Sequence, residues 1–400
     1  MLQRTAFNYC QRRTLVNVKL KWVKDRVLDN AVAGGRELKA ACVLVSIIAS
    51  DPDGCIAIYH LSRNRGQLGL PDGLKVSTFM RRFPNVFQEL HISDSGGTRV
   101  PWFKLSPEAL EIYENEVIAF QKCEVDILNR LKKLLMLCRN RMLPLQTIDQ
   151  LKWDLGLPYN YENSLIKMHS DVLKMVQLDD GRDALKLVKW DESLATSHLE
   201  RNSDSATENN GVLAFPIGFT RGFGLKRKCV KWLEDWQKLP YTSPYADASH
   251  LDPRTDVSEK RIVGVFHELL HLTLQKKTQR SNVSNLRKPL GLPQKFTKVF
   301  ERHPGIFYIS RKGDTQTVVL REGYDRDKLI EKHPLVDIRT KYLSMLNEGF
   351  LNRSRGLYKK DKMVDELMTS LDCEENVVLF QSEEESDCSV LSEYESDENT

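Results

Sequence analysis

The chain has 400 residues, of which 41% are hydrophobic and 28% are charged, so it can build packed cores and is not a wholly disordered chain. Its net charge of +4 conceals two opposite parts: residues 361–400 hold fourteen acids and one base, net −13, while the other residues hold 58 bases and 41 acids, net +17. A basic body predicts a polyanionic partner rather than an ordinary metabolic substrate; a solvated basic surface without a partner is the alternative.

The N-terminal segment is basic and amphipathic. Its first acidic residue is Asp25, and Arg4, Arg12 and Arg13 lie among scattered apolar residues before it. This composition predicts an organelle-import presequence over residues 1–17, because the segment lacks the long apolar core of a secretory signal; a basic nucleic-acid-binding arm is the alternative. The shortness of the segment favours the mitochondrion, with the chloroplast as the alternative.

The cysteine spacing and the length of the apolar runs limit the cellular environments that the sequence favours. The eight cysteines are scattered without the paired spacing of a zinc knuckle or a disulfide framework, so we expect reduced thiols. No run of about 18 apolar residues occurs, so we expect no membrane partner.

An internal repeat organises the chain. The word Leu-Gly-Leu-Pro occurs at residues 68–71, 155–158 and 290–293. Helical periodicity precedes each copy, over residues 38–48, 125–137 and 262–274. A predicted hairpin follows each copy, at 86–92 and 100–105, 172–178 and 184–188, and 306–309 and 317–320. This is the order of a winged helix, so we expect an α+β, mainly α, fold with three tandem winged-helix-like modules, each of helices plus a β-hairpin.

The stretches between and after the repeats differ in composition. Two segments precede the third copy: a polar linker, and a segment that contains Trp232 and Trp236. Two others follow it: a helical segment with a break at Pro334, and an acidic tail of low complexity. We expect the tail to be disordered. The expected organisation is presequence 1–17, module one 18–110, module two 111–197, polar linker 198–212, Trp-rich connecting segment 213–258, module three 259–324, helical closing segment 325–358 and acidic tail 359–400.

Basic rows mark the predicted interface. Lys295, Lys298 and Arg302 share one face of the recognition-helix stretch in module three, away from its apolar stripe. Such rows suit RNA phosphates, whereas a solvated helix face is the alternative. Trp22, Trp232 and Trp236 are expected core residues, with base stacking as the alternative. The candidate RNA-binding residues are Lys19, Lys21, Lys24, Arg26, Lys75, Arg81, Arg82, Lys226, Arg227, Lys228, Lys276, Lys277, Arg287, Lys288, Lys295, Lys298 and Arg302.

A His-Glu-x-x-His word occurs once, at His267, Glu268 and His271. This spacing is that of zinc metallopeptidases, so an enzyme of that class is the catalytic alternative. No third histidine follows closely, and the predicted helix is apolar on nearly every side, which favours a pair of core histidines. We therefore expect no metal, no cofactor and no catalytic residues.

Several long words resemble one known family. They are Lys19 to Arg26 (KLKWVKDR), Trp232 to Tyr245 (WLEDWQKLPYTSPY), Arg302 to Tyr308 (RHPGIFY) and Leu320 to Tyr324 (LREGY). Together they resemble the plant organelle RNA recognition (PORR) domain family, which includes the "what's this factor" proteins. The resemblance runs over about residues 19–350, so the three modules together would form one PORR domain.

The resemblance implies a function. It implies a nuclear-encoded plant protein, imported into mitochondria or chloroplasts, that binds group II intron RNA and promotes splicing without catalysing it. Other splicing factors in a ribonucleoprotein complex are the expected further partners. A winged-helix DNA-binding regulator is the alternative within the binding class. The family supplies no catalytic residues to carry over, so the contact residues above rest on charge alone.

Overall fold

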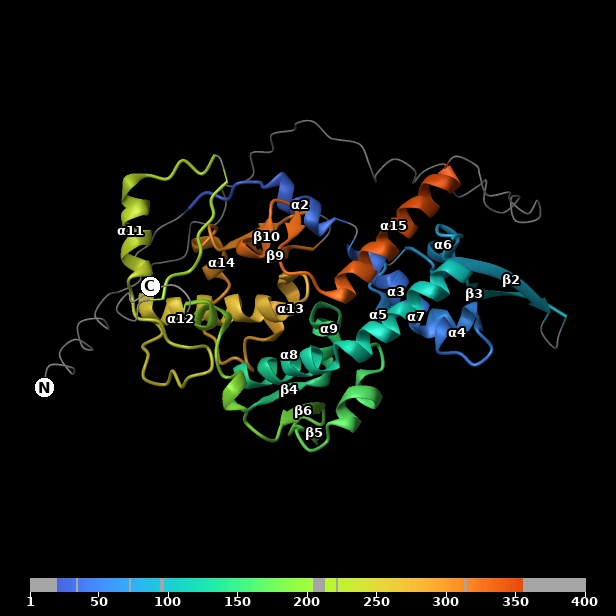
Figure 1. Ribbon diagram of the computed structural model, residues 1–400, viewed down its shortest axis with the longest axis horizontal. Coiled ribbons are helices and arrows are strands. Elements are labelled where there is room, and N and C mark those ends of the chain that lie inside the picture. The colour runs from blue at the N-terminus through green and yellow to red at the C-terminus, as the bar shows by residue number, and fades with distance from the viewer. Residues whose placement is uncertain are drawn as a thin grey trace, which may run out of the picture. The chain divides into compact units, whose positions relative to one another are not determined.

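The computed structural model describes residues 20–354 except for 34, 72, 94–96, 204–212, 221 and 313–314 (Figure 1). The expected presequence, the acidic tail and most of the polar linker lie outside the described residues. The fold is α+β, as expected, with many helices and small antiparallel sheets. None of the helices in this part of the chain is both long and apolar enough to span a bilayer.

One order of elements occurs three times. A helix leads into a short strand, further helical turns follow, and a hairpin ends the unit. The first unit (residues 35–105) contains α3 (Gly35–Ala49), β1 (Cys55–Ala57), α4 (Ile58–Arg63), α5 (Arg65–Leu68), α6 (Val76–Arg81), β2 (Phe87–Ser93) and β3 (Arg99–Leu105). The second unit (residues 124–187) contains α8 (Glu124–Leu137), β4 (Met142–Pro144), α9 (Leu145–Leu155), the π-helical turn η1 (Glu162–Ile166), β5 (Leu173–Gln177) and β6 (Asp183–Leu187). The third unit (residues 256–320) contains α12 (Asp256–Leu272), β7 (Lys277–Gln279), α13 (Arg280–Asn285), α14 (Lys298–Arg302), β8 (Phe307–Ser310) and β9 (Thr317–Leu320).

Each unit has the same sheet. The last strand lies in the centre and pairs antiparallel with both others, in the orders β1-β3-β2, β4-β6-β5 and β7-β9-β8. The expected hairpins and leading helices are confirmed. The short first strands were not expected, because three residues are too few to show an alternating pattern.

The first leucine of the Leu-Gly-Leu-Pro word ends α5 in the first unit and α9 in the second, and in the third unit four turn residues separate the word from the end of α13. The glycines of the word, Gly69, Gly156 and Gly291, have φ of 65°, 77° and 62°, the left-handed conformation that stops a helix and favours glycine. The leucines on both sides of each glycine are buried. The word therefore turns the chain while leaving two side chains in the core.

The remaining elements connect and cover the units. They are α2 (Arg26–Val32), α7 (Pro107–Lys122), η2 (Glu192–Leu194), α10 (His198–Ser203), α11 (Arg227–Gln237), η3 (Arg321–Gly323), β10 (Tyr324–Asp325), β11 (Lys328–Leu329) and α15 (Pro334–Ser354). The closing segment differs from the expected one: β10 and β11 form a hairpin, and the helix begins at Pro334 instead of breaking there. Proline suits a first helical turn because that turn needs no N–H donor.

Helix α12 is the most deeply buried helix of the third unit, with fifteen of its seventeen residues buried. It packs against α8, α14 and β9. Trp232 and Trp236 of α11 are 8% and 2% exposed, and their rings lie 5.5 and 4.2 Å from the ring of His303. These two tryptophans are therefore core residues and not stacking platforms.

Candidate nucleic-acid interface

The basic residues expected to bind RNA fall into two groups in the structure. Ten of them are exposed, and none of these ten makes an ion pair with another described residue. They are Lys21, Lys24, Arg26, Lys75, Lys226, Arg227, Lys228, Lys288, Lys295 and Lys298. Arg82 and Arg287 are half-buried and likewise unpaired within residues 20–354. Lys19 lies outside the described residues.

The other four candidates are held by the protein itself. Arg81 makes two hydrogen bonds to the carboxylate of Glu89, at 2.8 and 2.6 Å. Arg302 lies 3.0 Å from the carboxylate of Glu259, and its guanidinium lies over the ring of Trp232. A basic side chain that already pairs with a carboxylate of the same chain binds a phosphate less strongly.

Lys276 and Lys277 are also engaged. Lys276 is 2% exposed, pairs with Glu331 at 2.5 Å and donates to the backbone oxygen of His271 at 2.8 Å. Lys277 donates to the backbone oxygen of Ala31. Burial lowers the pKa of both lysines, that of Lys277 to about 8. Their positions fit a structural role at the C-terminal end of α12.

The basic row of the third unit does not lie on a single helix. Helix α14 begins at Lys298, so Lys295 lies in the turn before it. The apolar side is as expected: Phe296, Val299 and Phe300 are all buried. The three basic residues are regularly spaced in the sequence, but their surroundings differ. Lys295 and Lys298 are exposed, whereas Arg302 is paired.

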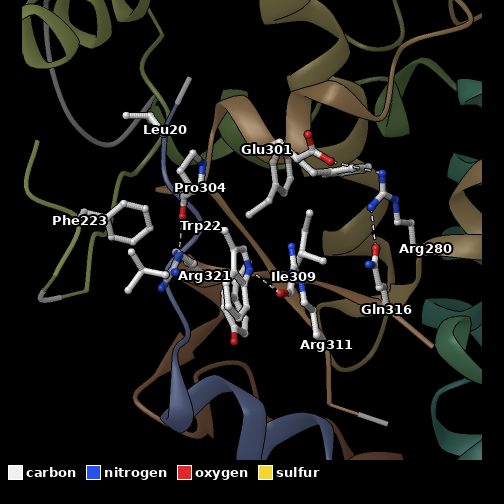
Figure 2. A pocket seen from close by; sticks show the side chains of 14 residues that line it. Leu20, Trp22, Phe223, Arg280, Glu301, Pro304, Ile309, Arg311, Gln316 and Arg321 are labelled. Atoms are coloured by element: carbon white, nitrogen blue, oxygen red, sulfur yellow. Dashed lines mark hydrogen bonds and ion pairs between the residues drawn. The ribbon is translucent and has the colours of Figure 1, made fainter. Parts of the chain in front are cut away.

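A pocket of about 240 Å³ opens between residues 20–23 and the third unit (Figure 2). Figure 2 shows Trp22 at its centre, between Arg321 and Ile309. The indole Nε1 donates to the backbone oxygen of Ile309 at 3.0 Å, and the guanidinium of Arg311 lies 4.5 Å from the centre of the indole ring. Trp22 therefore contributes an aromatic wall with a cation against it.

Two arginines form the polar side of the pocket. Arg280 donates to Oε1 of Gln316 at 2.6 Å and lies 3.5 Å from the carboxylate of Glu301. Arg321 donates to the backbone oxygen of Pro304 at 2.6 Å and pairs with Asp25 at 2.8 Å. The apolar part of the wall comes from Leu20, Val23, Phe223, Phe300, Pro304, Phe307, Tyr308 and Ile309.

The segment that carries Trp22 is anchored to the third unit by buried hydrogen bonds. The carboxylate of Asp29 accepts from the hydroxyls of Tyr308 and Ser310, at 2.8 and 2.6 Å. The backbone N–H of Asp25 donates to the Tyr308 hydroxyl at 3.1 Å. These contacts join residues about 280 positions apart, so no spacing in the sequence indicated them.

The His-Glu-x-x-His histidines converge on a residue from another element. Nε2 of His267 and Nε2 of His271 lie 2.6 and 2.5 Å from the same carboxylate oxygen of Glu322 in η3. Burial lowers the pKa of His271 to about 3. Burial acts to raise the pKa of Glu322, but the contacts with both histidines outweigh it and hold that pKa well below its usual range. Sequence spacing could not place Glu322 here.

Two residues of this cluster, together with His198, form the one set in the described part that could hold a metal ion. His198 of α10, His271 and Glu322 have ligand atoms within 4.8 Å of one another. Two features favour a hydrogen-bonded cluster instead. The rings of His198 and His271 are stacked nearly parallel, so their nitrogens do not aim at one point. The distance of 2.5 Å between Nε2 of His271 and Glu322 is also shorter than the separation of about 3.3 Å between ligands around tetrahedral zinc.

Glu268, the would-be general base of a metallopeptidase, faces away from solvent. Its carboxylate lies 2.6 Å from Nζ of Lys133 and accepts from the Tyr245 hydroxyl at 2.7 Å and from the backbone N–H of His198 at 2.6 Å. Burial acts to raise its pKa, but the ammonium of Lys133 outweighs this and lowers it. A buried carboxylate that is held by an ammonium, a hydroxyl and a backbone N–H serves the fold, so the arrangement does not resemble a hydrolytic site.

Comparisons with known proteins identify the chain's relatives. Residues 23–351 match the family model of the plant organelle RNA recognition domain. The chain is 36% identical over 354 residues to Protein WHAT'S THIS FACTOR 9, mitochondrial, of Arabidopsis thaliana, a match that covers 87% of this chain and 90% of the relative. It is 32% identical over 333 residues to Protein WHAT'S THIS FACTOR 1, chloroplastic, of Zea mays, covering 81% and 66%.

A relative with another kind of name also matches. Protein ROOT PRIMORDIUM DEFECTIVE 1 of Arabidopsis thaliana is 31% identical over 335 residues, covering 80% of this chain and 81% of the relative. No solved structure matches the chain. With a family model that spans most of its length, the chain belongs to the plant organelle RNA recognition domain family.

Proposed function

We propose that the protein binds organellar intron RNA and promotes group II intron splicing, while the RNA itself supplies the catalysis. The observation that carries this proposal is the set of ten exposed basic side chains without an ion pair in the described part of the chain. Free cations on a folded surface attract a phosphate backbone, because binding releases the counterions of that backbone. Family membership makes RNA the expected polyanion.

We infer further that the three repeated units are winged-helix-like modules. The support is the recurring order of helix, short strand, helices and hairpin, with the last strand central in each sheet. In the first and third units, exposed Lys75 and Lys298 lie at the start of the helix before the hairpin. The second unit has exposed Met168 after the corresponding turn η1, so it contributes less charge.

The mitochondrion is the proposed compartment, and other splicing factors are the proposed protein partners. A relative whose name is mitochondrial covers 87% of this chain, and relatives with chloroplastic names make the chloroplast the competing location. A tagged copy imaged in plant cells with markers for both organelles decides between them.

Immunoprecipitation from isolated organelles, followed by sequencing of bound RNA, tests the function. We expect enrichment of a few intron-containing transcripts, and in plants lacking the protein we expect those same transcripts to accumulate unspliced. Enrichment of DNA, or of no nucleic acid, overturns the proposal. Enrichment of transcripts whose splicing does not change in the mutant plants overturns the splicing role and leaves RNA binding standing.

A further inference from the structure

We propose that the pocket around Trp22 holds one unpaired nucleobase of the bound RNA, and that it prefers a base with carbonyl oxygens, such as uracil, over adenine. This inference rests on the proposed function, because it names a contact within the RNA interface. The pocket is small, about 240 Å³, and combines aromatic walls with arginines. That combination suits a flat, polar-edged ring attached to a phosphate backbone.

The stacking surface comes from Trp22 and Arg311. The Arg311 guanidinium lies against the indole, and Arg311 is exposed. The described residues offer its N–H groups no carboxylate or carbonyl partner. A guanidinium plane held on an aromatic ring presents its other face and its N–H donors to a ligand, as in the recognition of single-stranded RNA.

The donors in the pocket set the base preference. Because Arg280 can only donate, its 2.6 Å hydrogen bond fixes the Oε1 side of the Gln316 amide, so Nε2 of Gln316 is left as a donor. No other partner for Nε2 is recorded among residues 20–354. Gln316 and Arg311 therefore both offer N–H groups to a base edge. Uracil offers these donors two carbonyl oxygens, whereas the acceptors N1 and N7 of adenine each lie beside its amino group, which would face the same donors.

The pocket is held in shape before any RNA arrives. Trp22 is fixed by its bond to Ile309, and the chain on its C-terminal side is fixed by Asp25 and Asp29. A binding site whose side chains are already immobilised loses less conformational entropy on binding. Exposed Lys21 and Lys24 lie on both sides of Trp22 in the sequence and suit the flanking phosphates.

The test uses the purified full chain and single-stranded 12-mers of uridine and of adenosine. We expect tighter binding of the uridine oligomer, and we expect an oligomer carrying 5-iodouridine to crosslink under ultraviolet light to Trp22 or Phe223, as mapped by mass spectrometry. Arg311→Lys keeps the charge and removes the flat guanidinium, so we expect uridine affinity to fall about tenfold with an unchanged salt dependence. Arg254→Lys, at an exposed arginine that lies outside the pocket and is not among the candidate RNA-binding residues, is the matched control and is expected to bind as the wild type does.

The outcomes separate the two proposals. Crosslinks only outside the pocket, or uridine affinity and preference unchanged in Arg311→Lys, overturn the nucleobase site while RNA binding stands. Equal affinity for both oligomers overturns the proposed preference. If the wild-type chain binds neither oligomer and no organellar intron RNA, the proposed function itself is overturned.

Discussion

The third unit carries basic side chains in two regions, and the regions differ in what those side chains contact. Near the start of α14, Lys295 and Lys298 are exposed and make no ion pair with a described residue. At the two ends of α12, Arg302 faces Glu259 and Asp256, and Lys276 faces Glu331. The first region is available to a polyanion, and the second stabilises the fold.

The difference shows that the number of basic residues is a poor measure of an interface. A buried cation has lost its hydration and must be compensated by nearby acceptors. Its charge is therefore largely neutralised within the protein and attracts a phosphate only weakly. An exposed lysine keeps its hydration and its counterions until a phosphate replaces them. Four predictions test this comparison.

The largest effect is expected at Arg302. Arg302→Gln leaves the buried carboxylates of Glu259 and Asp256 without their cation, so we expect the free energy of unfolding to fall by about 3 kcal/mol. Urea unfolding followed by circular dichroism measures this change. A loss below about 0.5 kcal/mol, together with weaker RNA binding, would place Arg302 with the exposed group instead.

Acid should destabilise the His–Glu cluster. His271 has a pKa of about 3 in the folded protein, below its ordinary 6.5, so the unfolded chain takes up a proton first as the pH falls. Stability is therefore retained above about pH 6.5 and lost toward pH 3, by about 2 kcal/mol for this group at pH 5. The depressed pKa of Glu322 acts in the same direction at lower pH.

Comparison with His271→Asn isolates the effect of His271. Glu116, whose pKa burial raises to about 7, acts in the opposite direction in both proteins and cancels in the difference. We expect the variant's unfolding free energy to depend less on pH between 6.5 and 4.5. Parallel pH profiles for the two proteins would contradict the proposed protonation.

The exposed region should affect RNA and leave stability unchanged. Lys295→Gln with Lys298→Gln removes two free cations, so we expect RNA affinity to fall several-fold and the salt slope to decrease by about one to two. Lys186→Gln with Lys189→Gln removes the same charge from two exposed positions, one in β6 and one just after it, that are not among the candidates. Equal losses in the two double variants would mean that only net charge matters.

The smallest effect is expected in the second unit. Met168 is 69% exposed, so Met168→Arg adds an exposed cation to the second unit. We expect RNA affinity to rise by about twofold, with the free energy of unfolding unchanged within about 0.5 kcal/mol. Filter binding at two salt concentrations measures the gain, and unchanged affinity would show that this position of the second unit does not contact RNA.

Much of the fold was predictable because its signals are local. Helical periodicity located α3, α8 and α12, and the turns located the three hairpins. The three-residue strands and the start of α15 at Pro334 were missed, since the first are too short for a pattern and proline permits either a break or a start. Trp22, left open as core or platform, is half-buried on a pocket wall.

The site was less predictable because it depends on distant contacts. Regular spacing grouped Lys295, Lys298 and Arg302, but only the tertiary structure places carboxylates beside the last of them. In the same way, Glu322 lies more than fifty positions from His267, and Gln316 lies almost 300 positions from Trp22. Charge and periodicity describe one element at a time, whereas an interface is assembled from several.

The anchoring of residues 20–32 to the third unit has a consequence for assembly. On the ribosome, and in a translocation channel entered from the N-terminus, Asp29 emerges long before Tyr308 and Ser310, the groups that bind it. This segment must therefore remain unpaired until almost all of the described chain has emerged. Because closing so long a loop is slow, its docking is expected to be a late folding event, and a chaperone would meet residues 20–32 as the last undocked segment of the described chain.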